Sequence, residues 1–534
     1  MTRRPVHALL GAGLAAAFAV APALPAFAAS HSPIAGSGSS WSSNAVNQWV
    51  ADVQPSGLQV VFTASGSAIG RKDFANKTTD FAVSDIGFQG TDKVSGDQDT
   101  SQGRDFVYLP IVAGGTAFPY HLQVGGKLVR NLRLSGTSLS KIFTNQITNW
   151  NDPAITKDNN GKAFPSKPII PVVHSEGSGS SAQFTRYLDT VHSGDWRAFY
   201  GGSGFTEYFP RKAGAIAQNG SDGVMNYVSS DAADGSIGYD EYSYALGKNY
   251  PVAKISNANG YYTLPTQYNV AVALTSAKIN EDKSSPDYLL QNLDGVYTQK
   301  DNRTYALSSY SYLIIPTAAS DPRMTTAKRQ TLADYLYYSI CEGQKEMGPI
   351  GYSPLPVNLA QASFDQIAKL KTADNNVDLD KRNINTCGNP TFIAGQPKRN
   401  YLAEIAPQPQ ACDRDGAGPC TTTAAVNANP GTTGAPAAAP GSHPISGGNP
   451  VAPGTTGTTV AGKPILAGGS VQTPTTTQTL TEPTVAPVAE AIPVELSGRR
   501  SVISGSVLGP LAVLLLLIVV ITPPLLARRH EAGK

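Results

Sequence analysis

IIPVVHSEGSGSSAQFTRYL, residues 169–188, contains the most informative succession of patterns in the chain. An apolar run of strand length is followed by a turn of serine and glycine, and then by Phe184, Tyr187 and Leu188 at helical spacing. Strand, turn and helix in this order are typical of α/β proteins, in which helices cover both faces of a mainly parallel sheet. The segment therefore predicts an α/β fold.

The same order of elements recurs toward the N-terminus. Further buried strands are expected at Leu58–Thr63, Asp80–Ser84 and Phe106–Val112. A helix is expected around Trp49, because Val46, Trp49, Val50 and Val53 repeat at helical spacing. The predicted head, residues 30–406, exceeds the usual size of one hydrophobic core, so we expect two lobes. The first lobe is expected to comprise about 34–112 plus about 250–371, and the second about 113–249.

The two ends of the chain indicate export and membrane anchoring. Residues 1–28 combine two early arginines, an apolar run and a small-residue cleavage pattern, as signal peptides do. Residues 506–527 are mostly aliphatic and long enough to form a transmembrane helix. Basic residues follow directly, so the tail, 528–534, is expected in the cytoplasm and the head outside the cell, anchored in the plasma membrane.

Residues 407–500 are rich in Pro, Thr, Ala and Gly. From 421 to 493 only Lys463, Glu482 and Glu490 are charged, and aromatic residues are absent. Such a composition cannot bury enough apolar area to offset the entropy of ordering, so a disordered stalk is expected.

Charge and cysteine content exclude some classes of function. The chain has 41 Lys and Arg against 39 Asp and Glu, a net charge of +2. This charge is too small to attract the phosphate backbone of nucleic acid, which argues against a nucleic-acid-binding protein. An even set of cysteines in an exported chain predicts disulfides, and the spacing does not resemble a zinc site. The four are Cys341, Cys387, Cys412 and Cys420. The simplest pairing joins each cysteine to the next one along the chain, although the sequence leaves the pairing open. No metal or other cofactor is expected.

Three turns rich in serine and glycine precede predicted helices, at Gly36–Trp41, Ser65–Gly70 and Ser175–Ser181. Glycine permits close approach of the backbone, serine hydroxyls donate hydrogen bonds, and helix N-termini present unpaired N–H groups. If the three turns converge, they form an anion cage of neutral donors. Each serine taken alone is equally an ordinary helix N-cap.

Asp85 ends the predicted strand that starts at Asp80. A carboxylate can only accept hydrogen bonds, so beside an anion cage it would favour a protonated oxyanion such as phosphate over sulfate. The alternative is a turn or capping residue.

These motifs resemble the phosphate-binding proteins of ABC transporters, the PstS family. The resemblance spans roughly 34–370 and rests on segments that include GSGSSW (36–41), SGSAIG (65–70), DFAVSD (80–85), HSEGSGSSAQFTRYL (174–188), NGSDGV (219–224) and GSIGYDEYSYA (235–245). It implies a two-lobed periplasmic-binding-protein fold, with mainly parallel or mixed sheets flanked by helices, ahead of the stalk and transmembrane helix.

The resemblance also implies a set of phosphate ligands. These are Ser40, Trp41, Ser67, Asp85, Ser178, Gly179 and Ser180. His174 departs from the family pattern, which has an arginine there, and Glu176 stands where the family has an aspartate that pairs with that arginine. Because histidine titrates near neutrality, we expect weaker anion affinity that falls as pH rises, with Arg71 as a possible extra cation. Alternatively, His174 only hydrogen-bonds Glu176 at the hinge.

The function implied is that of a membrane-tethered receptor that captures phosphate, or a related oxyanion, for the permease subunits of an ABC importer. A surface module with a weakened ligand site, acting as adhesin or sensor, is the alternative. No enzymatic activity and no catalytic residues are expected, because Gly177–Ser180 is not a nucleophile elbow and no His/Asp set has metal-binding spacing.

Overall fold

The computed structural model describes residues 31–91, 98–212, 214–380, 382–393, 395–396 and 399–420. The predicted signal peptide, transmembrane helix and cytoplasmic tail lie outside the described residues, as does the stalk from residue 421 onward. Within these ranges no helix is both long enough and apolar enough to cross a bilayer.

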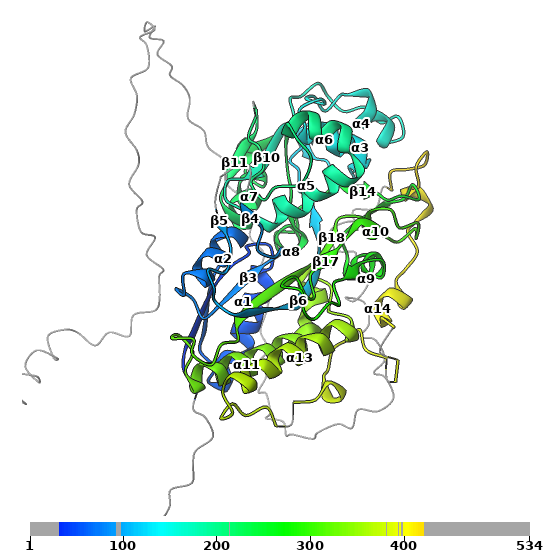
Figure 1. Ribbon diagram of the computed structural model, residues 1–534. Coiled ribbons are helices and arrows are strands. Elements are labelled where there is room, and N and C mark those ends of the chain that lie inside the picture. The colour runs from blue at the N-terminus through cyan, green and yellow to red at the C-terminus, as the bar shows by residue number, and fades with distance from the viewer. Residues whose placement is uncertain are drawn as a thin grey trace, which may run out of the picture. The chain divides into compact units, whose positions relative to one another are not determined.

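A six-stranded sheet forms the centre of the first half of the head (Figure 1). Its strand order is β13-β6-β18-β3-β1-β2. The strands are β1 (Ile34–Gly38), β2 (Val60–Thr63), β3 (Phe81–Ser84), β6 (Phe106–Ala117), β13 (Asp240–Glu241) and β18 (Ser308–Pro316). Strand β1 runs parallel to β2 and β3, whereas β18 is antiparallel to β3 and β6. The sheet is therefore mixed, and the strands expected at 58–63, 80–84 and 106–112 are confirmed.

Strand β1 was not expected from the sequence, and its last three residues belong to the turn expected at 36–41. It lacks the apolar alternation of a typical strand, since three of its five residues are Gly36, Ser37 and Gly38. Glycine is required at 36, because a Cβ there would lie 2.1 Å from the ring of Phe81 on β3. The packing of an aromatic ring across the sheet, rather than local propensity, places this strand.

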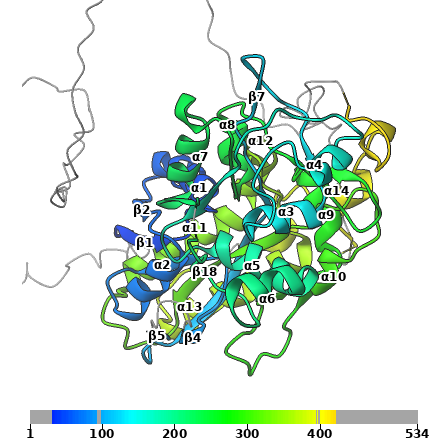
Figure 2. The same ribbon diagram turned by 90° about the horizontal axis from the view of Figure 1, so that it is seen from above.

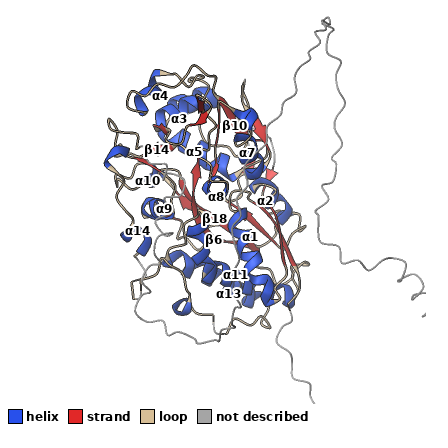
Figure 3. Cartoon of the chain, turned by 180° about the vertical axis from the view of Figure 1, so that it is seen from behind, coloured by secondary structure: helices blue, strands red, loops and turns tan. Residues whose placement is uncertain are grey.

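Helices cover the large sheet. Those of the first half in contact with its strands include α1 (Ser43–Val53), α2 (Ser67–Ala75), α8 (Tyr242–Gly247), α9 (Gln267–Leu274), α11 (Thr326–Ile340) and α13 (Val357–Ala373). Three shorter helices pack against other helices: α10 (Asp294–Tyr297) against one of the second half, α12 (Met347–Ile350) against α1 and α8, and α14 (Tyr401–Ile405) against α9. The helix expected around Trp49 is confirmed as α1. The indole Nε1 of Trp49 donates to the carbonyl of Gly343 at 3.0 Å. Figure 3 shows α1, α11 and α13 gathered beside the sheet.

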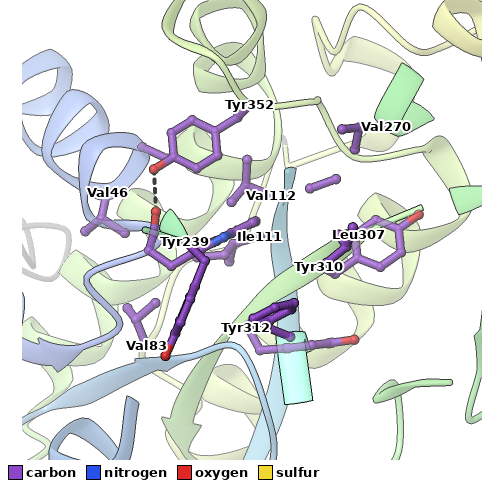
Figure 4. Close-up of a cluster of buried hydrophobic side chains, with 14 of the residues drawn as sticks. Val46, Val83, Ile111, Val112, Tyr239, Val270, Leu307, Tyr310, Tyr312 and Tyr352 are labelled. Carbon is purple, nitrogen blue, oxygen red and sulfur yellow. Dashed lines mark hydrogen bonds between the residues drawn. The ribbon is translucent and has the colours of Figure 1, made fainter. Parts of the chain in front are cut away.

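Side chains of β3, β6 and β18 fill the interior (Figure 4). Val83, Ile111 and Val112 are buried together with Tyr310 and Tyr312. The strands predicted at 80–84 and 106–112 thus contribute to the core, together with β18, which was not among the strands expected from the sequence.

The second half is built on a smaller parallel sheet with the order β11-β10-β12. Its elements are α3 (Gly136–Phe143), α4 (Pro153–Asp158), β10 (Ile170–His174), α5 (Gly179–Val191), α6 (Ser193–Tyr200), β11 (Ile216–Gln218), α7 (Gly220–Val228) and β12 (Ser236–Gly238). Helices α5 and α6 lie side by side (Figure 2). The segment 169–188 therefore forms the predicted strand, turn and helix.

Short ladders complete the described part of the head. They are β4 (Gly90–Thr91) with β5 (Gln98–Asp99), β7 (Gln123–Val124) with β8 (Lys127–Leu128), β16 (Lys278–Ile279) with β17 (Gln291–Asn292), and β14 (Lys254–Ser256) with β15 (Tyr262–Thr263) and β9 (Arg133–Leu134). Residues 254–256 thus pair with a strand of the expected second lobe, although they follow the expected boundary near residue 250.

Strands β6 and β13 connect the two halves. Thr116 and Ala117 at the end of β6 pair with Glu241 and Asp240, and the chain enters the second half directly after β6 and leaves it directly before β13. Both carboxyl side chains of β13 are therefore buried where the halves meet.

Both predicted disulfides are present, and each joins sequence neighbours. Cys341 pairs with Cys387 and Cys412 pairs with Cys420. The first ties residues 382–393 to the end of α11, and the second closes a short loop at the end of the described chain.

Candidate anion-binding site

Three serine hydroxyls converge on the carboxylate of Asp85, directly after β3. Ser39 donates to Oδ2 at 2.7 Å and Ser67 donates to the same oxygen at 3.2 Å. Ser311 of β18 donates to Oδ1 at 2.6 Å. All four residues are buried. Strand ends and a helix N-terminus that are far apart in sequence thus meet at one carboxylate.

The N-terminus of α5 meets this cluster from the second half. Ser178 caps the helix, since its Oγ accepts from the backbone N–H of Ser181. Gly179 lies against Asp85 so closely that a Cβ would be 2.0 Å from Oδ2. Ser180 Oγ is buried and has no hydrogen-bond partner among the described residues. The helix therefore presents a free hydroxyl and its N-terminal N–H groups, which together suit an anion.

Ser40 reaches across to the N-terminus of α7. Its Oγ accepts from the backbone N–H of Ser221 at 3.1 Å and lies 3.2 Å from Ser221 Oγ. A second contact joins the two turns themselves, where Ala68 N–H of α2 donates to the carbonyl of Gly177 at 3.1 Å. The halves are therefore closed on each other around the cluster.

Burial raises the pKa of Asp85, while the three serine hydrogen bonds and the charge of Arg71 oppose the shift. A more basic carboxylate is a stronger acceptor for an acidic O–H group. The site thus offers several neutral donors and one strong acceptor, the combination that a singly or doubly protonated oxyanion requires.

Arg71 is fully buried beside this site, but its guanidinium already has partners. Its Nε donates to Asp99 at 2.8 Å, Nη1 to Ser84 at 2.8 Å and Nη2 to Glu207 at 2.6 Å. Glu207 belongs to the second half, so the ion pair crosses the cleft. Arg71 acts on Asp85 through its charge, and its predicted role as an additional anion ligand stays a prediction.

His174, at the end of β10, is also buried. Its Nδ1 lies 2.8 Å from Glu176 Oε1, and the other carboxylate oxygen of Glu176 accepts from Gly220 N–H at 3.0 Å. Burial favours the neutral imidazole, but the hydrogen bond and charge of Glu176 outweigh it and raise the pKa of His174. Nε2 has no hydrogen-bond partner in the described structure. His174 therefore forms the expected contact with Glu176 and keeps one free ring nitrogen.

Asp240 and Glu241 add two buried carboxyl groups at the junction of the halves. Burial raises the pKa of Asp240 to about 7, and it raises that of Glu241 well above its ordinary value. Asp240 Oδ1 accepts from the backbone N–H of Glu241 at 2.7 Å, and Oδ2 is buried without a hydrogen-bond partner among the described residues.

Comparison with known proteins places this geometry in a family. A family profile described as PBP superfamily domain matches residues 22–342. Phosphate-binding protein PstS 2 of Mycobacterium tuberculosis is 31% identical over 326 residues, covering 60% of this chain and 82% of that protein. The chain belongs to the PstS family of periplasmic binding proteins.

Other relatives agree with this assignment. Phosphate-binding protein PstS of Xylella fastidiosa is 29% identical over 331 residues, which cover 61% of this chain and 83% of that protein. A crystal structure of an ancestral soluble variant of the human phosphate-binding protein has a TM-score of 0.51 and 20% identity, covering 65% of this chain and 98% of that one. The latter similarity supports the two-lobed periplasmic-binding-protein fold.

The predicted site residues of this PstS-family chain do not all belong to the cluster around Asp85. Ser67 and Gly179 both contact Asp85, and Ser178 and Ser180 are the neighbours of Gly179 in sequence. Ser40 lies one residue from the cluster and faces Ser221 instead. The ring of Trp41 is buried against Tyr352, whose hydroxyl donates to the Trp41 carbonyl at 2.6 Å, and the predicted role of Trp41 as a ligand stays a prediction.

The sequence did not indicate three residues that contact the predicted ligands of this PstS-family chain. Ser39 was missed because its neighbour Ser40 matched the family position, and Ser221 lay in a quoted motif without an assigned role. Ser311 lies on β18, which brings it to Asp85 from 226 residues away. Only the alternation of small and large residues in SSYSYL (308–313) could have indicated a buried serine there.

The described residues hold no group of His, Cys, Asp and Glu that is placed to bind a metal ion.

Proposed function

We propose that this chain captures inorganic phosphate outside the cell and delivers it to the permease subunits of an ABC importer. One observation carries the proposal. The Asp85 carboxylate, held by three serine hydroxyls from one half, faces the N-terminus of α5 from the other half. An ion bound there would touch both halves and would therefore favour the closed arrangement.

The chemistry of the site favours phosphate among oxyanions. Serine hydroxyls and helix N–H groups solvate any oxyanion, but a carboxylate acceptor repels one that has no proton to donate. Phosphate carries such a proton near neutral pH, whereas sulfate does not. The relatives from Mycobacterium tuberculosis and Xylella fastidiosa are both phosphate-binding proteins, which supports the same ligand.

The expected stalk and membrane helix extend this proposal. Residues 506–527 would hold the head at the outer face of the plasma membrane, and residues 407–500 would let it move between capture and delivery. No chemical change of the ligand is proposed, since the clustered groups are hydrogen-bond donors and one acceptor.

Calorimetric titration of the full-length chain in detergent tests the proposal. Orthophosphate should bind and sulfate should not, and Asp85→Asn should weaken phosphate binding about 10-fold to 100-fold by removing a charged acceptor. Asp365→Asn, an exposed carboxylate on α13, is the matched control and should change nothing. If the parent chain binds no phosphate, the alternative of a surface adhesin or sensor with a weakened site gains support instead.

A further inference from the structure

A cavity of about 470 Å³ adjoins Asp85 in the cleft between the halves. Asp85 and the residues after it form one wall, α5 and Phe205 of the second half form another, and β16, β17 and Tyr312 close the rest. Figure 1 shows α5 facing β17 and β18. Small-molecule sites start at roughly 300 Å³, so this space is suited to a molecule larger than one phosphate ion.

Helix α5 leads from the anion cage into the cavity. Gln183 and Arg186 both line the cavity and lie three residues apart, on one face of the helix that begins at Gly179. Gln183 Nε2 donates to the backbone carbonyl of Asp85 at 2.8 Å. Its Oε1 is buried and has no partner in the described chain, although only 8% of the residue is exposed. A polar group is thus left unsatisfied between the cage and Arg186.

Arg186 is a half-buried cation that forms no ion pair with the residues that the structure describes. Its guanidinium lies over the ring of Phe205 at 4.1 Å, and its Nε is buried without a hydrogen-bond partner among the residues described. The buried arginines Arg71 and Arg104 each pair with carboxylates instead. Arg186 is half-buried, so water reaches part of its guanidinium, but its buried Nε gains a hydrogen-bond partner only if an acceptor enters the cavity. An anion in the cavity would supply a charge-assisted partner for this group.

The other charged groups of the cavity lie at its rim. Lys278 lines it and, in the described structure, forms no ion pair. Asp287 opposes these cations but is exposed, so solvent and salt screen its charge. The inner part of the cavity therefore presents Arg186 as its dominant charge beside Asp85.

We propose that this cavity is a second anion subsite, which holds the distal group of a condensed phosphate whose first phosphoryl group occupies the cage at Asp85 and Ser180. The proposal rests on the proposed function, because the cage must accept a phosphoryl group. Arg186 binds the distal phosphoryl group, with Lys278 at the rim. The ligand class is thus inorganic diphosphate and longer chains, in addition to orthophosphate.

Titration of the full-length chain in detergent with orthophosphate, pyrophosphate and glycerol 3-phosphate tests this. Glycerol 3-phosphate has a similar length but no second anionic group. The parent chain should bind pyrophosphate, and Arg186→Gln should weaken that binding about tenfold or more while weakening glycerol 3-phosphate far less. Arg186→Lys should restore part of the loss. Arg197→Gln, an exposed arginine on α6, is the matched control, and thermal melting checks that each variant folds.

The outcomes separate this proposal from the proposed function. Orthophosphate binding without pyrophosphate binding, or pyrophosphate binding that Arg186→Gln leaves unchanged, overturns the second subsite and leaves phosphate capture intact. An equal loss for pyrophosphate and glycerol 3-phosphate also overturns it, since Arg186 would then not recognise the second charge. Absence of orthophosphate binding, with pyrophosphate binding that depends on Arg186, supports the subsite and removes orthophosphate capture.

Discussion

His174 is a titratable group where the family pattern has an always-charged arginine. Burial favours the neutral imidazole, but the hydrogen bond and charge of Glu176 outweigh burial and raise the pKa of His174, so the imidazolium persists to higher pH than in an unfolded chain and is lost as pH rises through that raised value. We expect phosphate affinity to fall over the same interval. Because phosphate also titrates near neutrality, the measurement is the affinity ratio of the parent chain to His174→Gln by calorimetry across pH 6 to 9.

This ratio should be well above one in mild acid and should approach one in alkali. His31→Gln, an exposed histidine that pairs with Asp334, serves as the control and should give a flat ratio. A ratio for His174→Gln that does not change with pH would show that His174 serves only to hold Glu176.

Some residues of the candidate site could be predicted from the sequence, and others could not. Ser67, Asp85 and Gly179 were predictable because each belongs to a local motif with a known chemical use. Ser311 was not, because its role depends on the antiparallel pairing of β18 with β3, which no local pattern encodes. The partners of Arg71 were equally hidden, since Asp99 and Glu207 lie 28 and 136 residues away.

Ser178 has two proposed roles, as the N-cap of α5 and as a phosphate ligand. Ser135, the N-cap of α3, serves as a comparison because it has the capping role alone. Ser178 caps α5 and adjoins the cage, while Ser135 caps α3 by accepting from Ser138 N–H at 3.1 Å, away from Asp85. Ser178→Ala and Ser135→Ala should each lower the free energy of unfolding by about 1 kcal/mol in urea titrations. Only Ser178→Ala should also weaken phosphate binding. Equal effects of both variants on phosphate affinity would contradict a ligand role for Ser178.

The two disulfides allow a test of how covalent closure stabilises separate elements. Cys341–Cys387 closes a separation of 46 residues and Cys412–Cys420 one of 8. On the chain-entropy account, the longer loop contributes about 4 kcal/mol and the shorter about 2.5 kcal/mol. Replacing each pair with serine should therefore destabilise the head more for 341/387 than for 412/420, measured by urea unfolding. The reverse order would mean that native contacts around the bonds outweigh loop entropy.

Among the elements, the four strands with apolar runs and the helix around Trp49 were predictable, whereas β18 and β1 were not predicted. The glycines of β1 conceal that strand in the sequence, and Gly36 is needed because Phe81 packs directly against it. The pairing of β14 with β9 was likewise not indicated by the sequence, because it depends on contacts between distant segments.

For the whole head, the buried junction between the halves predicts how stability depends on pH. Burial raises the pKa of Asp240 to about 7, against about 3.9 in an unfolded chain, so the folded state binds more protons between these values. The free energy of unfolding should thus fall as pH rises from about 4 to 7, by roughly 4 kcal/mol for this group. Glu241, with its pKa raised well above the ordinary value, acts in the same direction.

Asp240→Asn tests this assignment, because it keeps a polar group of the same shape that cannot ionise. In urea titrations between pH 5 and 8, the parent chain should lose stability steadily, and the variant should lose much less. By pH 8 the variant should therefore be the more stable of the two, although it removes a charged residue. Asp365→Asn should keep the slope of the parent chain, since that carboxylate is exposed on α13. Parallel curves for the parent chain and Asp240→Asn would show that another group causes the pH dependence. His174 would be the next group to test, because its raised pKa also makes the free energy of unfolding fall as pH rises above about 6.5.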